Sequence, residues 1–286
     1  MKNIPKVMYL YWDGGTMSFL NYLTVISFHK HNPSWDIVVY TPTNKHEGIT
    51  WSTGEQSVSY DGTDYWGSVG ILDYVEIRTF DFTTIEISND IPEVFKSDFI
   101  RWHILSTMGG GWSDFDILYT KPINEIDLRD NMVTGIVEEV STVLVFDGYH
   151  HIIGFYLSEP NNKFFGNILE KSKTSLNPGG YQSVGSRLLM KMYPNLDVVG
   201  FSHNNVANLP MDVVYPIIPS HKTIHDLFNN SNMGDYFTNN TIGVHWFNGD
   251  KLSKEYLNNF TSTKTNGSII SKLIEEYEDI YSNSLL

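Results

Sequence analysis

Residues 92–116 constrain the fold of this chain more than any other segment. Between residues 92 and 108 the apolar side chains recur every three or four positions, which is typical of an amphipathic helix. Three glycines follow directly at 109, 110 and 111, and glycine readily adopts the left-handed conformation that ends a helix. We expect extended chain after them. The segment therefore predicts a helix, a tight turn and a strand in immediate succession.

Charged side chains occupy defined faces of this helix and strand. Asp98 and Arg101 are three residues apart, so they share one face of the helix. In a strand, side chains two apart point the same way, which places Trp112, Asp114 and Asp116 on one side. Two carboxylates about 7 Å apart along a strand can serve one hard cation, directly or through a water molecule. The expected ion is Mn²⁺ or Mg²⁺, which prefers oxygen ligands and leaves room for substrate phosphates.

Each part of this pattern also has an ordinary explanation. An Asp-x-Asp pair is expected by chance in a chain with 33 acidic residues. Asp98 and Arg101 alone would be a helix-face ion pair, and the glycine run alone would be a turn. The order of the parts is what favours a metal that holds a diphosphate, and hence a nucleotide-sugar site.

This order resembles the DXD-containing glycosyltransferases of the GT-A fold. More narrowly, it is similar to the retaining group that includes capsular and outer-chain sugar transferases and the catalytic domains of the large clostridial glucosylating toxins. Their pattern is Ser-Asp-x-x-Arg on a helix, then Gly-Gly, an aromatic residue and Asp-x-Asp. The matching residues here are Ser97, Asp98, Arg101, Gly110, Trp112, Asp114 and Asp116.

The resemblance implies a fold and a set of roles. The fold is an α/β, GT-A type nucleotide-sugar-binding fold with a mixed central sheet, flanking helices and a short C-terminal helical addition. Asp114 and Asp116 would bind the metal and the donor diphosphate. Ser97, Asp98 and Arg101 would contact the donor sugar, and Trp112 would shape its pocket.

Residues 4–15 are similar to the opening strand of the same family. This similarity implies that Trp12 stacks on the donor base, with Tyr11 beside it. Without it, core packing is the commoner fate of a tryptophan after an apolar strand. The flanking Asp13-Gly14-Gly15 indicates a loop at the end of a strand, where ligands bind in open α/β sheets.

Residues 242–251 carry a third similarity. Related transferases have a histidine near the C-terminus as the third metal ligand, and His245 fits that role. A satisfied histidine at the end of a strand is the alternative. The donor pocket would be lined by Trp246, Asn248, Gly249 and Lys251. Gln182, near the start of a helix expected at residues 179–192, is the candidate that reaches the transferred sugar.

The remaining segments predict a parallel βαβ unit at the start of the chain and further strands and helices of an α/β fold after it. Thr16 or Ser18 is expected to cap the first helix, and residues 48–70 form a loop. Strands are predicted at residues 6–12, 36–40, 74–80, 131–138, 142–146, 154–157 and 213–216. Further helices are predicted at residues 163–171 and 268–281.

Composition limits the class of protein. The 286 residues, 41% of them hydrophobic, suffice for one large α/β domain over residues 1–286, with 251–286 as a helical extension packed on it. No apolar run is long enough for a membrane span, and no signal-peptide core is present, so we expect a cytoplasmic protein of a bacterial or phage-infected bacterial cell. The net charge of −14 counts against a broad nucleic-acid surface.

The sequence predicts an enzyme that moves a sugar from a nucleoside diphosphate sugar, a UDP-sugar by resemblance, to a hydroxyl acceptor. Retention of configuration comes with the resemblance alone. A surface glycan is the default acceptor; a hydroxymethylated DNA base, as in phage-type transferases, and a protein are alternatives. A non-catalytic sugar-nucleotide or glycan-binding protein is the rival. A glycosidase is disfavoured because carboxylates on one side of a strand cannot flank a sugar ring. The sequence leaves the oligomeric state open.

Overall fold

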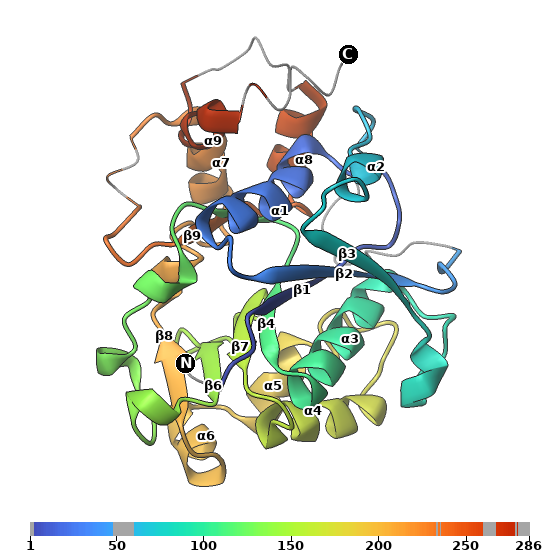
Figure 1. The fold of residues 1–286 in the computed structure, drawn as a ribbon, viewed down its shortest axis with the longest axis vertical. Coiled ribbons are helices and arrows are strands. Elements are labelled where there is room, and N and C mark those ends of the chain that lie inside the picture. Colours follow the sequence, from blue (N-terminus) through green and yellow to red (C-terminus); the bar gives the residue numbers. More distant parts are fainter. Residues whose placement is uncertain are drawn as a thin grey trace.

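A seven-stranded mixed sheet runs through the middle of the molecule (Figure 1). The computed structural model describes residues 3–47, 60–232, 234, 236–259, 267–277 and 279. In order across the sheet, the strands are β3 (Val75–Phe80), β2 (Asp36–Pro42), β1 (Val7–Tyr11), β4 (Gly110–Ser113), β7 (Phe155–Ser158), β6 (Thr142–Val145) and β8 (Val206–Leu209). β7 runs antiparallel to both neighbours, and the other pairings are parallel. A separate antiparallel pair joins β5 (Ile117–Tyr119) to β9 (Gly243–His245).

Helices cover both faces of the sheet (Figure 1). One side carries α1 (Phe19–His31), α7 (His221–Asn229), α8 (Lys251–Asn259) and α9 (Ile269–Ile274), with α2 (Trp66–Val69) beside α1. The other side carries α3 (Glu93–Thr107), α4 (Lys163–Lys173) and α5 (Ser186–Met192), and α6 (Leu196–Ser202) lies next to β8. The mixed central sheet with flanking helices that the sequence predicts is confirmed.

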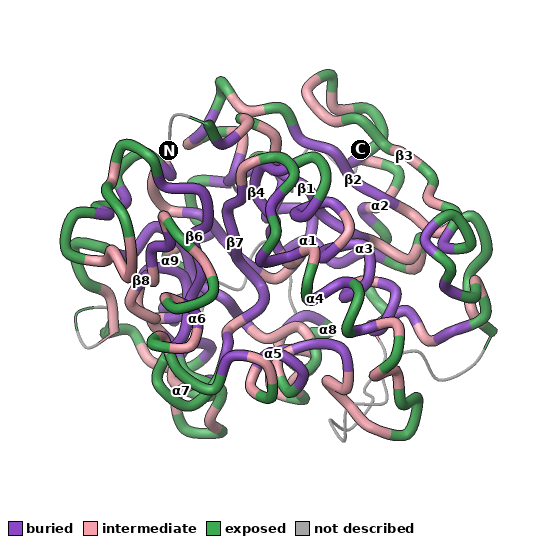
Figure 2. Tube along the Cα trace, turned by 90° about the horizontal axis from the view of Figure 1, so that it is seen from below, coloured by how far each residue is buried: buried purple, intermediate pink, exposed green. Residues whose placement is uncertain are grey.

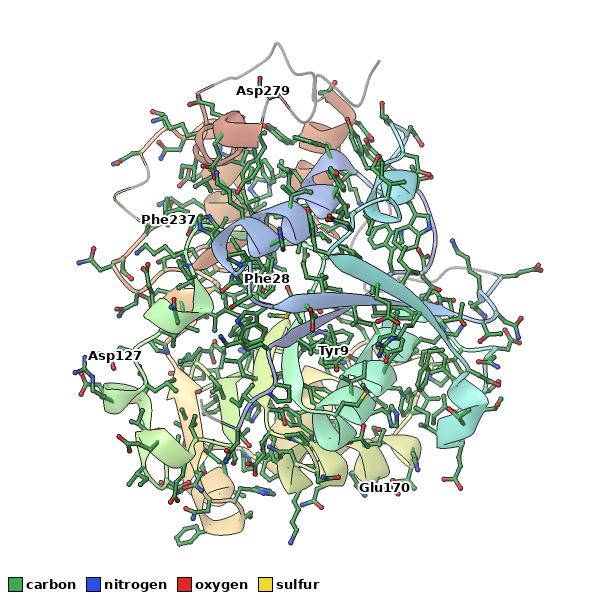
Figure 3. The ribbon with its side chains drawn as sticks, viewed as in Figure 1. Tyr9, Phe28, Asp127, Glu170, Phe237 and Asp279 are labelled. Carbon is green, nitrogen blue, oxygen red and sulfur yellow. The ribbon has the colours of Figure 1, made fainter. Side chains whose placement is uncertain are left out.

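The sheet separates two hydrophobic cores. Successive side chains of a strand point to opposite faces, so Met8 and Leu10 of β1 enter the core under α1, whereas Tyr9 and Tyr11 enter the core under α3. The central strands are buried along their length, as Figure 2 shows, and Tyr9 lies near the middle of the molecule in Figure 3. Their buried positions provide a rigid base for the loops at their ends.

The predicted βαβ start is present. Ser18 caps α1, because its side chain accepts a hydrogen bond from the Asn21 amide. β1 and β2 then pair in parallel, with Met8 opposite Ile37. The C-terminal residues also pack on the domain core, to which α9 contributes Ile269, Ile270 and Ile274.

The turn from α3 into β4 depends on glycine. Gly109 has φ +68° and Gly110 has φ +100°, conformations that other residues rarely adopt. A Cβ atom on Gly109 would lie 2.6 Å from the carbonyl carbon of Glu159. The chain therefore reverses closely against the segment after β7 and enters the sheet between β1 and β7.

Two predicted strands are wrong. Residues 131–138 form 3₁₀ turns, Arg129–Asn131 and Val137–Glu139, with only an isolated bridge from Met132 to Ala207. In the segment 213–216, Val213 ends a 3₁₀ turn, Met211–Val213, and the prolines at 210 and 216 limit strand pairing. This segment still accepts hydrogen bonds from the backbone of Ile242 and His245.

Two helix boundaries also differ from the prediction. The helix expected from residue 179 begins at Ser186, because Gln182 has φ +62° and interrupts regular helix. The C-terminal helix changes to a 3₁₀ turn, Glu275–Tyr277; of the rest of residues 268–281, positions 278, 280 and 281 lie outside the described residues. In the predicted loop at 48–70, positions 48–59 also lie outside the described residues, and α2 occupies part of the remainder.

Among the described residues, we find no helix with the length and apolar character that crossing a bilayer requires.

The crowding at Gly109 generates a stability prediction. We expect Gly109→Ala to lower the free energy of unfolding by about 1–3 kcal/mol more than Gly267→Ala. Gly267 is the matched control because it has the same φ of +68° and nothing within 4 Å of an added Cβ. Urea denaturation of both variants measures the difference. Equal losses would show that only the backbone conformation, and not the contact with Glu159, requires glycine.

Candidate metal and donor site

The pairing of β5 with β9 builds the centre of the site. Ile117 lies opposite His245 in this antiparallel pair, so Asp116 at the start of β5 comes beside the His245 ring. His245 Nε2 lies 2.9 Å from Asp116 Oδ1. The chain turns at Phe115 and Asp116, so the continuous strand predicted for residues 112–117 is wrong in this detail. The turn nevertheless leaves both aspartates next to His245.

Asp116 is fixed on three sides. Its Oδ2 accepts a 2.9 Å hydrogen bond from the Asn248 amide, and its carbonyl oxygen accepts a 2.8 Å bond from the Trp246 amide. Burial by itself would raise the pKa of Asp116, but His245 and the Asn248 amide outweigh it and hold this pKa below its ordinary value. Asp116 is therefore a carboxylate at neutral pH.

Asp114 connects the turn before β5 to α3. Its Oδ1 accepts hydrogen bonds from Trp112 Nε1 at 2.9 Å and from Arg101 Nη2 at 3.0 Å. Its amide donates to the Gly154 carbonyl oxygen at 2.8 Å. Both of these side-chain hydrogen bonds end on Oδ1 and neither involves Oδ2. Oδ2 could therefore coordinate a cation.

These three residues form a cluster that could bind a metal ion. One ligand atom from each of Asp114, Asp116 and His245 lies within 4.8 Å of the others. Their side chains are 28%, 15% and 10% exposed, respectively, so solvent and ions can reach them. Two carboxylates and one imidazole suit a divalent cation such as Mn²⁺ or Mg²⁺ that keeps positions open for substrate oxygens.

Asp98 and Arg101 form an almost fully buried ion pair, and Arg101 also pairs with Asp114 of the cluster. Burial raises the pKa of Asp98 to about 6, against the opposing effect of Arg101. Gln182 lies close to Asp98, because a Cβ atom on Gly185 would meet both its Oε1 and Asp98 Oδ2. Gln182 Oε1 accepts a 2.8 Å bond from the Ser186 amide, which ties this side chain to the start of α5.

The two aromatic residues expected at the donor base lie in different surroundings. Trp12 is half-buried, donates its indole N–H to the Gly15 carbonyl oxygen at 2.8 Å, and packs edge-on against Phe115 at 5.3 Å between ring centroids. It therefore borders the turn that carries the two aspartates. Tyr11 is buried and its hydroxyl donates to Glu93, so its ring belongs to the core under α3.

The remaining donor-pocket candidates separate into buried and exposed residues. The Trp246 indole is fully buried in the core, so only its backbone reaches the site. Asn248 lies at the site through its amide, whereas Gly249 and Lys251 are exposed. Lys251 forms a 3.5 Å ion pair with Glu255 along α8. Ser97 is half-buried on α3 beside Asp98, and Trp112 is buried against the Arg101 guanidinium.

Three residues at the site have no counterpart among the sequence predictions. Tyr215 stacks on the His245 ring, and burial, with Asp114 and Asp116 adding to it, raises the pKa of its hydroxyl well above 10. Gly154 lies between Tyr215 and Asp114. Lys254 of α8 donates a hydrogen bond to Asn248 Oδ1 at 2.7 Å, and the Asn248 amide in turn donates to Asp116. Tyr215 and Gly154 reach the site from distant segments, so no spacing in the sequence identifies them, whereas Lys254 lies only six residues after its partner Asn248.

Comparisons with known proteins give structural matches only. No family model and no curated protein matches the chain. A solved structure of the PaToxG glycosyltransferase is 14% identical over 68% of this chain and 73% of that chain, with a TM-score of 0.43. The galactosyltransferase LgtC in complex with donor and acceptor sugar analogues is 10% identical over 84% and 87%, with a TM-score of 0.40. A glycosyltransferase involved in glycosylation of the major capsid of PBCV-1 is 10% identical over 88% and 99%, with a TM-score of 0.44.

The raised pKa of Asp98 predicts a pH effect on stability. Between its ordinary value of 3.8 and its value of about 6 in the folded chain, the folded state binds more protons at this group than the unfolded state. The stability that this group contributes is therefore present at low pH and is lost as the pH rises through about 6. We expect the free energy of unfolding, relative to that of Asp98→Asn, to fall from pH 4 to pH 7.

Urea denaturation across this pH range measures the effect. Asp127→Asn is the control, because its partner Arg129 lowers the pKa of Asp127 to about 2, outside the range tested. A difference between the unaltered chain and Asp98→Asn that stays constant with pH would show that the pKa of Asp98 is not raised by folding, and one that rises with pH would show that it is lowered.

Proposed function

We propose that this protein is a metal-dependent glycosyltransferase that uses a nucleoside diphosphate sugar. The observation that carries the proposal is the cluster of Asp114, Asp116 and His245, whose ligand atoms lie within 4.8 Å of one another. It adjoins the buried Asp98–Arg101 pair and the half-buried Trp12. The site thus combines groups suited to a cation, to sugar hydroxyls and to a flat base.

Each group has a defined part in this proposal. Asp114, Asp116 and His245 would hold Mn²⁺ or Mg²⁺, which when bound would neutralise charge developing on the leaving diphosphate. Asp98, with a pKa of about 6, can accept a hydrogen bond from a sugar hydroxyl, and Arg101 can donate one. Trp12 offers a ring face to the base.

The diphosphate requires a positive partner from the protein. Lys251 is exposed and paired with Glu255, whereas Lys254 already bonds Asn248, whose amide holds Asp116. We therefore propose Lys254 in place of Lys251 as the residue that faces the diphosphate. Gln182, beside Asp98, lies where it could contact the transferred sugar.

Finer features of the proposal rest on the sequence resemblance. These are a UDP-sugar donor, retention of configuration and a glycan acceptor; the action of residues 1–286 as one domain and a cytoplasmic location are proposed from length and composition. A DNA-base acceptor, a protein acceptor and a non-catalytic binding protein are the alternatives that experiment must separate.

Donor hydrolysis tests the proposal directly. The purified protein would be mixed with UDP-, GDP- and TDP-sugars in the presence of Mn²⁺ or of EDTA. We expect slow release of one nucleotide, lost with EDTA and reduced at least about 100-fold in Asp116→Asn, because the charge stabilisation of the leaving group is removed. Asp127→Asn is the matched control, since Asp127 lies at the outer edge of the molecule (Figure 3).

The possible outcomes separate the alternatives. Metal-dependent nucleotide binding without release from any donor would identify a non-catalytic binding protein. Neither binding nor release would contradict the donor-site assignment. Release that survives in Asp116→Asn would place the chemistry elsewhere.

A further inference from the structure

We propose that Tyr215 is a positioning residue for two of the three candidate metal ligands: its ring stacks on His245, and its hydroxyl lies beside Asp114. The inference rests on the proposed function, because it concerns the same metal site. It adds a residue from the segment between β8 and α7 that no sequence motif identifies.

The ring of Tyr215 controls the orientation of His245. The two ring centroids are 4.5 Å apart with an interplanar angle of 21°, so the rings stack. Phe247 contacts the same imidazole edge-on at 4.4 Å, and its amide donates to His245 Nδ1 at 3.3 Å. The imidazole is thereby confined between two aromatic rings, with Nε2 directed at Asp116 Oδ1.

The backbone fixes Tyr215 relative to this histidine. The His245 amide donates to the Val214 carbonyl oxygen at 2.9 Å, and the Ile242 amide donates to the Val213 carbonyl oxygen at 2.9 Å. The Tyr215 amide donates to Met211 at 2.8 Å, which closes the turn that presents the ring. These bonds hold the segment that carries Tyr215 against β9, even though 213–215 is not a regular strand.

The hydroxyl of Tyr215 reaches the other side of the site. A Cβ atom on Gly154 would lie 2.0 Å from the Tyr215 hydroxyl oxygen and 2.9 Å from Asp114 Oδ2. The two oxygens thus approach the same point beside Gly154, where only glycine leaves space. The Gly154 carbonyl oxygen already accepts from the Asp114 amide at 2.8 Å. The hydroxyl therefore limits the space around the carboxylate oxygen that Arg101 and Trp112 do not hold.

This arrangement separates the effects of two substitutions. Tyr215→Phe keeps the stacking on His245 and removes only the hydroxyl, whereas Tyr215→Leu removes both contacts. Groups that orient metal ligands typically contribute 10- to 100-fold to metal affinity. We expect an affinity loss of about that size for Tyr215→Leu and a smaller loss for Tyr215→Phe.

The test measures Mn²⁺ binding to the full chain, by the loss of the free-ion electron paramagnetic resonance signal, alongside the thermal midpoint. Tyr193→Phe is the matched control, because Tyr193 is 5% exposed against 6% for Tyr215 and its hydroxyl bonds His203, away from the cluster. His245→Ala marks the complete loss of one ligand. Tyr193→Phe should change the dissociation constant for Mn²⁺ by less than about twofold, within the effect of a distant substitution.

The results distinguish this inference from the function it rests on. Mn²⁺ binding by the unaltered chain that weakens in the order Tyr215→Phe, Tyr215→Leu and His245→Ala supports the inference. Lower thermal midpoints for both Tyr215 variants with unchanged Mn²⁺ affinity would overturn it and leave Tyr215 as a packing residue. No Mn²⁺ binding by the unaltered chain would overturn the metal site itself. If Tyr215→Leu does not fold, the comparison of Tyr215→Phe with Tyr193→Phe still decides the question.

Discussion

The candidate site depends on one long-range interaction, the antiparallel pairing of β5 with β9. Ile117 lies opposite His245 in this pair, and the loop after β9 returns two backbone amides to Asp116. A one-residue change of register would turn His245 to the opposite face of the strand. The same pairing fixes Val213 and Val214 and hence the segment that carries Tyr215. Candidate metal ligands from two distant parts of the chain are thus brought together by backbone hydrogen bonds.

The charge balance around this pairing explains why a cation suits the site. Asp98, Asp114 and Asp116 face one guanidinium, that of Arg101, and one imidazole, that of His245. Carboxylates that are removed from water are unfavourable unless they are paired or bound to a metal. Arg101 bonds two of them and leaves Asp116 with His245. A divalent cation between Asp114 and Asp116 would balance the remaining negative charge.

Local sequence patterns predicted the parts of the molecule that local physics determines. The helix periodicity before Gly109 and the apolar runs of β1 and β2 depend on neighbouring residues, and α3, β1 and β2 are where they were expected. The strands predicted at 131–138 and 213–216 failed because strand formation requires a partner, and prolines at 210 and 216 limit pairing there. The sequence of one segment does not show which other strand it can pair with.

The site was predictable to the extent that its residues are close in sequence. Asp98, Arg101, Asp114 and Asp116 lie within 20 positions; helix periodicity places the first two on one face, whereas a turn, and not the predicted strand alternation, brings the two aspartates together. His245 was identified through the family resemblance and not through spacing. Tyr215 and Gly154 were missed because their contacts arise only when distant segments assemble around the turn at Phe115. Lys254 was missed although its partner Asn248 is only six residues away, because the sequence does not show which lysine of α8 turns toward the site. The buried position of Trp246 likewise follows from packing that no motif reports.

The most direct test of the metal centre is a crystal of the protein grown with Mn²⁺ and UDP, with anomalous diffraction recorded at the manganese edge. The structure predicts one strong peak about 2.0–2.3 Å from oxygens of Asp114 and Asp116 and from His245 Nε2, distances usual for such ligands. A peak elsewhere, with the direct contact between His245 Nε2 and Asp116 Oδ1 intact, would contradict the account. So would a well-ordered UDP bound at this site without any metal peak.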